Sequence, residues 1–501
     1  MSETVNKPES PNDKASYQEL HRPASEFKTR SDYLDHELEI MKPRRWRINL
    51  PGRDFRFEWE DLVPALAGTI GITVMYSAVM SSYAQAYNLL PSFVIENVRV
   101  EMLVSALIFC IFVSGFLNPR ANLAGNHGPM IPMIGMIAMS GGHPLALAIL
   151  IAVFGGLLSI VKGGSKLVNL TSEGVAGGLL VYLGVMGAQG QITHLIDWAS
   201  NMKMDDGSTA HMGYIAFAVL FANVILYSLL AKWGKRWLAI PICSALAVAI
   251  ALLLGAPLHF TTGPGLPNLN PMYWWGSTET GWKLGMPTIG HFIASLPFAI
   301  LAVAMWSPDF LGHRIFQELN YPKKAKNVLM DVDDTMAGCS VRQFVGTAFG
   351  GGNVTSSWGT YMIPAAIAKR PIPAGGILLG CMCILVACIG YPMDIAVWPP
   401  VMSIALLVGV FLPLVEAGMQ MVKNAASSQT AGICIFASMV VNPVFGWAIT
   451  MLLDNNGLIG DKERAKRLSK ADRIIIPGVA FVICLIAMLA VGMIKGIPAL
   501  L

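Results

Sequence analysis

The chain has 501 residues, of which 54% are hydrophobic and only 13% are charged, and its mean hydropathy is +0.56. Soluble domains carry roughly 25% charged residues, so this composition excludes a soluble globular protein and predicts an all-α polytopic membrane protein. The net charge of +4 is attributed to basic loops that set membrane topology, and no nucleic-acid partner is expected.

Residues 1–60 are polar and form a separate N-terminal region. They contain neither the apolar segment nor the small-residue cleavage site of a signal peptide. They carry the basic cluster Lys42–Arg47, "KPRRWR", shortly before the first apolar run. Because basic segments stay on the cytoplasmic side, we expect a cytoplasmic N-terminus and a multi-pass protein of the cell's inner (plasma) membrane. Contact of the cluster with anionic lipid is the alternative.

Uncharged apolar runs recur from Leu62 to near the end of the chain, and most approach the ~20 residues needed to span a bilayer. They cover residues 62–80, 102–117, 143–161, 174–188, 212–231, 237–258, 289–306, 374–392, 395–415, 426–452 and 474–494. The eight cysteines lie in or beside these runs, where they serve as small core residues. No metal, haem or nucleotide motif is present, and no cofactor is expected beyond a coupling Na⁺ or H⁺.

Two glycine-rich polar stretches interrupt this pattern, "GNHGPMIP" from Gly125 and "GNVTSSWG" from Gly352. Non-helical backbone is tolerated in a membrane only inside protein or against a cavity. We therefore expect each to form a short extended piece near the midplane followed by a half-helix, with Pro129 in the first helical turn and Thr355–Ser357 as N-caps. Helix N-termini meeting there would attract an anion or an electron-rich ring. Close helix packing at the glycines is the simpler alternative.

Ionisable residues are rare within the apolar runs and mark candidate functional positions. Asp309 and His313 are four residues apart, so on a helix they share one face. A buried carboxylate there could carry a proton or bind Na⁺ together with the hydroxyl of Thr355. For His313 the alternative is a residue at the cytoplasmic end of the helix. Glu416 is either a gate carboxylate or a residue at a helix end.

Three pairs of features are separated by the same 227 positions, which predicts an internal repeat. The pairs are Leu62 with Ile289, Gly125 with Gly352, and Gln189 with Glu416. Broken hydrophobic segments at matching positions of two halves are typical of secondary transporters with inverted repeats, and seven spans in each half fit the apolar runs. The predicted divisions are an N-terminal region, 1–60; a first inverted repeat, 61–260; an extracytoplasmic loop, 261–287; and a second inverted repeat, 288–501.

One loop conflicts with a count of fourteen spans. The basic segment "DKERAKRLSKADR", residues 461–473, would then face the outside, against the rule for positive charge. If residues 426–452 instead form two short spans that meet near Asn442–Pro443, the loop moves inside and the last helix becomes a fifteenth span. The sequence leaves both alternatives open.

Three segments resemble one clan of transporters. "ALAGTIGITVMYSAVMSSYA" (65–84) is similar to the first span of SulP anion transporters. "GTAFGGGNVTSSWGTYMIP" (346–364) resembles the tenth span shared by SulP transporters and nucleobase–ascorbate permeases. "DFLGH" (309–313) resembles the acidic–x–x–Gly–His element of the uracil permease group.

The resemblance implies a seven-plus-seven inverted repeat with core and gate domains, a substrate site between the third and tenth spans, and a homodimer. Two departures matter. Thr360 stands where nucleobase permeases have a glutamate, and the chain ends at Leu501 without the C-terminal regulatory (STAS) domain that SulP proteins usually carry. The expected substrate-binding residues are Tyr76, Ser77, Asn126, His127, Gly128, Asn353, Thr355, Ser356, Ser357 and Thr360. The expected cation-coupling residues are Asp309, His313 and Glu416, with Na⁺ at Asp309 and Thr355.

The function predicted from these features is that of an elevator-type secondary transporter. It would move a small anionic solute, such as an inorganic oxyanion or a carboxylate, by symport with H⁺ or Na⁺. The alternatives are a nucleobase permease for uracil- or xanthine-like rings, which Thr360 disfavours, and an anion channel. No enzymatic activity is expected, because the sequence has neither HExxH nor GxSxG.

Overall fold

The computed structural model describes residues 15–121, 124–126, 130, 133–204, 206–352, 355–357, 359–490, 492–494 and 496–500. Nearly every element in these ranges is helical, so the all-α prediction is confirmed. Within them, eight helices are long and apolar enough to span a membrane, and up to ten do so if each of two bent pairs counts as one span. These pairs are α7 (Pro144–Ile160) with α8 (Gly163–Leu170), and α16 (Ala374–Ile389) with α17 (Tyr391–Val397).

The spanning helices begin and end where the local sequence directs. Asn88 adopts a left-handed conformation (φ 54°) that ends the first span, and Pro91 starts the second, as expected of a C-cap and a first helical residue. The helices are α4 (Leu62–Tyr87), α5 (Pro91–Val104) continued by the π-helical η3 (Ser105–Leu117), α9 (Glu173–Ser200), α10 (Gly213–Lys232), α11 (Ala239–Leu253), α13 (Ile289–Asn320), α18 (Pro399–Leu406) continued by η7 (Leu407–Phe411) and α19 (Leu412–Met421), and α23 (Ile476–Ala490).

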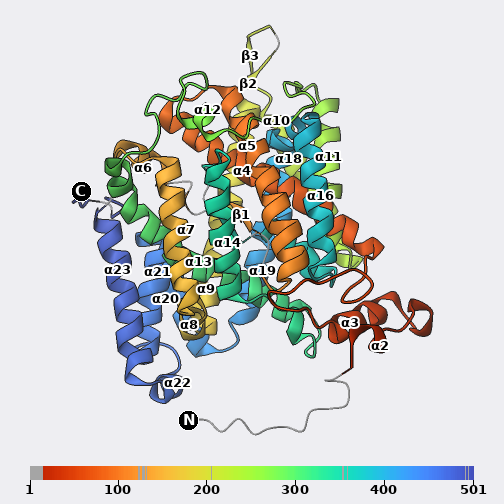
Figure 1. Ribbon diagram of the computed structural model, residues 1–501, viewed down its shortest axis with the longest axis vertical. Helices are drawn as coiled ribbons and strands as arrows, with labels where there is room; N and C mark the ends of the chain where they lie inside the picture. The colour runs from red at the N-terminus through yellow and green to blue at the C-terminus, as the bar shows by residue number, and fades with distance from the viewer. Residues whose placement is uncertain are drawn as a thin grey trace.

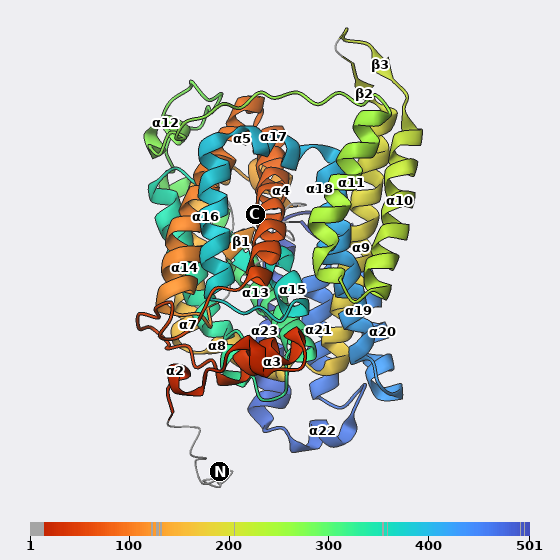
Figure 2. The same ribbon diagram turned by 90° about the vertical axis from the view of Figure 1, so that its right-hand side faces the viewer.

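The spanning helices form two groups, which we call the core and the gate. Figure 2 shows α4, α5, α7, α14 (Val332–Ala348) and α16 on one side and α9, α10, α11 and α18 on the other. The smaller hydrophobic cluster lies among α9, α10, α11 and α18, whereas the larger one draws on α4, α5, α7, α13 and α14 and also includes residues of the first turns of α9. The residue boundaries predicted for the two repeats stay predictions.

Two short strands cross between the halves of the chain. β1 (Ala124–Asn126) pairs antiparallel with β4 (Thr355–Ser357), with Gly125 opposite Ser356. A short helix follows each strand, α6 (Ile134–Met139) after β1 and α15 (Gly359–Ile367) after β4. The predicted strands and half-helices of the third and tenth spans are therefore confirmed. Thr355–Ser357 form the strand, and their predicted role as N-caps of α15 stays a prediction.

The segment 426–452 folds as two helices, α20 (Ala425–Val440) and α21 (Pro443–Asn455), which pack together. The side chain of Asn442 caps α21, and Pro443 is its first residue, so the break lies at the predicted dipeptide. The following loop, with α22 (Lys462–Arg467), therefore lies at the same end as α3 (Arg30–Ile40) of the N-terminal region (Figure 1). The alternative with an additional last span, α23, is the one that the fold adopts.

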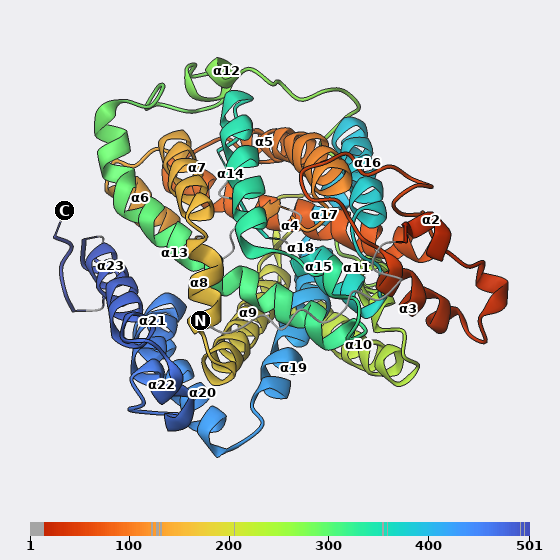
Figure 3. The ribbon, with the colours of Figure 1, turned by 60° about the horizontal axis from the view of Figure 1, so that its bottom comes forward.

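The opposite end carries the other connections. The hairpin of β2 (Met202–Lys203) and β3 (Thr209–Ala210) and the small helix α12 (Pro271–Trp275) lie there (Figures 1 and 2). The N-terminal region at the first end also contains α2 (Tyr17–Leu20). Figure 3, viewed from that end, shows α2 and α3 beside the core and α20, α21, α22 and α23 grouped apart from them.

Candidate functional site

The crossing of β1 and β4 is enclosed by core helices. β1 packs against α4 and η3, and β4 packs against α13 and α14. Non-helical backbone of this kind is tolerated in a membrane protein only inside protein or against a cavity. Asn126 and Thr355–Ser357 contribute backbone to this crossing, and Thr360 is the second residue of α15. The predicted residues His127, Gly128 and Asn353 lie outside the described residues.

Asp309 and His313 lie beside the second half of this crossing. Both are on α13, and Oδ1 of Asp309 is 3.6 Å from Nε2 of His313. Their side chains are 24% and 7% exposed, respectively, so the carboxylate is partly accessible while the imidazole is buried. Within the described part of the chain, Nδ1 of His313 has no hydrogen-bond partner.

His313 also contacts the start of α15. A Cβ built on Gly359 would lie 2.6 Å from Cε1 of the imidazole, so the first residue of α15 packs directly on the ring. The structure thus brings Asp309, His313 and the beginning of the tenth-span half-helix together. His313 is thus buried rather than solvated, and its predicted role in coupling stays a prediction.

Tyr76 and Ser77 occupy neighbouring positions on α4 but different environments. Tyr76 is fully buried, and its hydroxyl bonds to Ser105 and accepts a hydrogen bond from Arg342 over 3.2 Å. Its ring therefore belongs to a polar cluster between α4, α5 and α14. Ser77 is 4% exposed, and its hydroxyl has no partner among the described residues; its predicted role in substrate binding stays a prediction.

The sequence analysis missed two buried charges beside the crossing. Glu101 on α5 and Arg342 on α14 form an ion pair, and both side chains are 0% exposed. α14 has a polar sequence and was not among the apolar runs, so Arg342 was not considered. Glu101 lay one residue outside the run 102–117. The four-residue spacing of Asn97, Glu101 and Ser105 on one helix was the signal that could have found the pair.

Glu416 lies on α19, which packs against α9 and which we therefore count with the gate. Its carboxylate pairs with Arg236 of the short helix η5 (Arg236–Leu238) and accepts a hydrogen bond from the hydroxyl of Tyr227 over 3.3 Å. Because a guanidinium already offsets its charge, Glu416 holds parts of the gate together.

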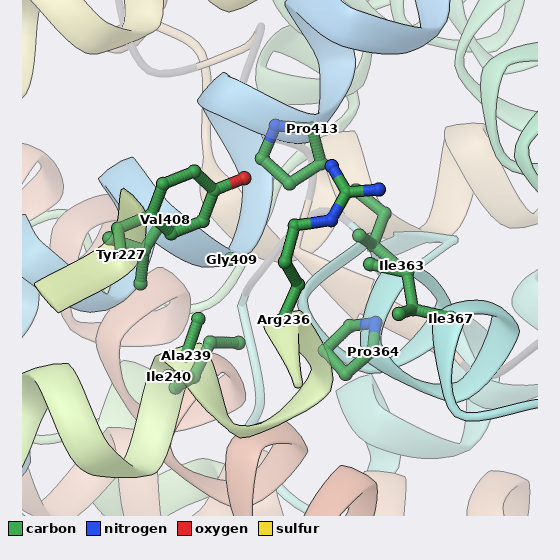
Figure 4. Close-up of a pocket in the computed structure, with 10 residues that line it drawn as sticks. All are labelled: Tyr227, Arg236, Ala239, Ile240, Ile363, Pro364, Ile367, Val408, Gly409 and Pro413. Atoms are coloured by element: carbon green, nitrogen blue, oxygen red, sulfur yellow. The ribbon is translucent and has the colours of Figure 1, made fainter. Parts of the chain in front are cut away.

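Arg236 and Tyr227 also line a pocket at the seam between gate and core (Figure 4). The pocket has an empty volume of about 230 Å³, including its open mouth. Ile363, Pro364 and Ile367 of α15 form its core side, and Val408, Gly409 and Pro413 belong to its gate side. The half-helix that carries Gly359 thus also faces the gate.

The family follows from the sequence as a whole. Residues 8–501 match the family model described as "Protein of unknown function (DUF3360)". The chain belongs to this family. No curated protein matches the sequence.

Solved structures give the fold. The murine Solute Carrier 26 family member A9, an anion transporter in the inward-facing state, has a TM-score of 0.51 at 12% identity, over 90% of this chain and 76% of that one. A second SLC26A9 structure has a TM-score of 0.47 at 13% identity over 79% of this chain, which spans 64% of that one. The transmembrane domain of the cyanobacterial bicarbonate transporter BicA has a TM-score of 0.45 at 12% identity, over 87% and 97%. The chain has an SLC26-like transporter fold, and the predicted resemblance to SulP transporters is confirmed for the fold.

Proposed function

We propose that this protein is an elevator-type secondary transporter that moves a small anion, an inorganic oxyanion or a carboxylate, together with H⁺ or Na⁺. The observation that carries the proposal is the contact between His313 and Gly359, which joins the Asp309–His313 pair to the start of α15 beside the strand crossing. The anion class is also supported by the murine SLC26 structure, whose protein is described as an anion transporter.

The charges at the site support an order in which the cation binds before the anion. The first backbone amides of α15 carry partial positive charge, which favours an anion. A carboxylate at mid-membrane costs at least ~2.5 kcal/mol on insertion scales, and a bound cation at Asp309 would offset its negative charge, with Thr355 as a further oxygen ligand for Na⁺. A loaded cation removes the repulsion between Asp309 and an arriving anion. The coupling is reciprocal, so each ligand tightens the other by the same factor.

The separation of core and gate supports an elevator movement. The crossing, Asp309 and α15 all belong to the core, whereas Arg236, Tyr227 and Glu416 tie gate elements to one another. The pocket at the seam leaves part of the contact between α15 and the gate unfilled. A core that carries the site past the gate would change the side of the membrane to which the ligand is exposed.

A ligand screen tests this proposal. Ligands that bind only the folded state raise the melting temperature by mass action. We expect purified protein to be stabilised by one of bicarbonate, sulfate or acetate, and more strongly with Na⁺ or at lower pH. Stabilisation by uracil or xanthine alone would favour the nucleobase permease. Anion current that reverses at the anion's own equilibrium potential, with no dependence on a cation gradient, would favour the channel.

We further propose a homodimer in the inner membrane, with a cytoplasmic N-terminus and contacts made by gate helices. The resemblance to dimeric transporters supports this assembly. Native mass spectrometry from a mild detergent should give twice the 53.9 kDa mass of the chain as the main species. A monomer under every mild condition would contradict the dimer.

A further inference from the structure

A line of polar side chains runs along one face of α5 beneath the chain that leads into β4. Asn97 and Glu101 are both 0% exposed. Asn97 Nδ2 donates to the carbonyl of Gly350 over 3.1 Å, and the Glu101 carboxylate lies against Gly351, where an added Cβ would collide with it. The carboxylate therefore contacts the backbone four residues before Thr355, the first residue of the strand.

Arg342 supplies the opposite charge from α14, which packs against both strands. Its guanidinium pairs with Glu101, donates from Nε to Ser105 over 2.8 Å, and lies 5.5 Å from the centre of the Tyr76 ring. Tyr76 and Ser105 bond to each other as well. One positive and one negative charge are thus held at fixed positions beside the crossing, shielded from water.

We propose that the Glu101–Arg342 pair sets the net charge that the site presents to its ligands, with Glu101 offsetting Arg342. A buried charge is screened much less than one in water and acts over several ångströms. With the pair intact the two contributions nearly cancel, and the anion is attracted mainly by the backbone amides of α15. The inference rests on the proposed function for the identity of the anion, but its effect on cation binding stands independently.

Neutralising one member of the Glu101–Arg342 pair should change the affinities for the anion and for Na⁺ in opposite directions. Glu101→Gln leaves surplus positive charge, so the anion should bind about tenfold more tightly and Na⁺ more weakly; Arg342→Gln should do the reverse. The double variant E101Q/R342Q should return both affinities to within about threefold of wild type. Affinities would be measured from the melting temperature of purified protein against bicarbonate, sulfate, acetate and Na⁺.

Asp61 and Arg370 offer a matched control, because they form another buried ion pair, 2.7 Å between Nε and Oδ1. Asp61 directly precedes α4, about 22 Å along the helix from Tyr76. Neutralising Asp61 or Arg370 should lower the melting temperature without shifting anion and Na⁺ affinity in opposite directions.

The proposal is overturned if both single variants weaken anion and Na⁺ binding alike, which is the result for a purely structural pair. If neither single variant folds, the double variant decides. Affinities near wild type support the charge balance, and a loss of about tenfold in a folded double variant overturns it. If wild type binds no anion, the proposed function fails, and the opposite shifts in Na⁺ affinity still test the pair.

Discussion

Gly359 is the residue at which the two parts of the candidate site touch. Replacing it with alanine would place a Cβ 2.6 Å from Cε1 of His313, so either the imidazole or the first turn of α15 must move. Overpacking of this kind typically costs about 1–3 kcal/mol. We expect Gly359→Ala to lower the melting temperature and to weaken anion binding.

The first repeat provides the control for this substitution. Gly135 lies in α6, the corresponding half-helix, and a Cβ built on it meets nothing within 4 Å. Gly135→Ala should be neutral or stabilising by up to about 1 kcal/mol. Equal melting temperatures for G359A, G135A and wild type would contradict the tight contact with His313.

His143, just before α7, gives the structure a pH-dependent element. Its Nδ1 accepts from the amide of Leu145 and its Nε2 donates to the carbonyl of Gly285, each over 3.0 Å, so the ring is held neutral. Burial lowers the pKa of His143 to about 4, although the hydrogen bond to Gly285 opposes this shift.

The sign of the resulting pH dependence follows from linkage. The unfolded imidazole has a pKa of about 6.5, so between about pH 6.5 and pH 4 the unfolded state binds a proton that the folded state does not. The stability supplied by neutral His143 is therefore present above pH 6.5 and is lost as the pH falls toward 4. His143→Asn keeps a helix-capping oxygen and should show a flatter melting temperature over this range. Parallel pH profiles for the two proteins would exclude this role of His143.

At the scale of elements, the loop that carries α12 is attached by a tryptophan to the chain that leads into β4. Trp275 of α12 is fully buried and donates from Nε1 to the carbonyl of Gly350 over 2.8 Å, beside the hydrogen bond from Asn97. Trp275→Phe should cost about 1 kcal/mol through the lost hydrogen bond, and Trp275→Ala about 3–5 kcal/mol through the cavity. Trp59→Phe is the matched control, since Trp59 is 82% exposed. If W275F has the same melting temperature as W59F, and only W275A is much less stable, then packing of the ring alone stabilises the protein and the contribution of the hydrogen bond is contradicted.

The elements also show what the sequence could predict. Long apolar helices such as α4 and α16 were predicted because lipid selects them by composition alone. α14 was not predicted, because its polar residues, Arg342 among them, are neutralised by partners on other helices that a one-dimensional pattern does not contain. The glycine-rich stretches predicted the strands, but their register depends on the pairing of two distant segments. For that reason the pairing of Thr355–Ser357 with Ala124–Asn126 was not predicted.

At the scale of the whole molecule, segments at both ends of the helical bundle are tied to the core. At the end that carries the N-terminal region, Arg45 pairs with Asp334 of α14, 2.6 Å from Nε to Oδ2, and Asp35 pairs with Lys369 after α15, 2.8 Å. At the opposite end, Asp394 of α17 accepts hydrogen bonds from the amide and hydroxyl of Thr261. The N-terminal region and part of the loop 261–287 are thus attached to the core, so in the proposed elevator movement they would move with it.

The coupling role of Asp309 is tested most directly by measuring ion-coupled anion uptake in proteoliposomes that contain the Asp309→Asn variant. The substitution keeps the size of the side chain and removes its charge, so the protein should fold and bind the stabilising anion. We predict that wild type accumulates this anion under an imposed Na⁺ or H⁺ gradient, whereas D309N exchanges it without net accumulation. Accumulation by D309N at the wild-type rate and with the same ion dependence would contradict the coupling role of Asp309.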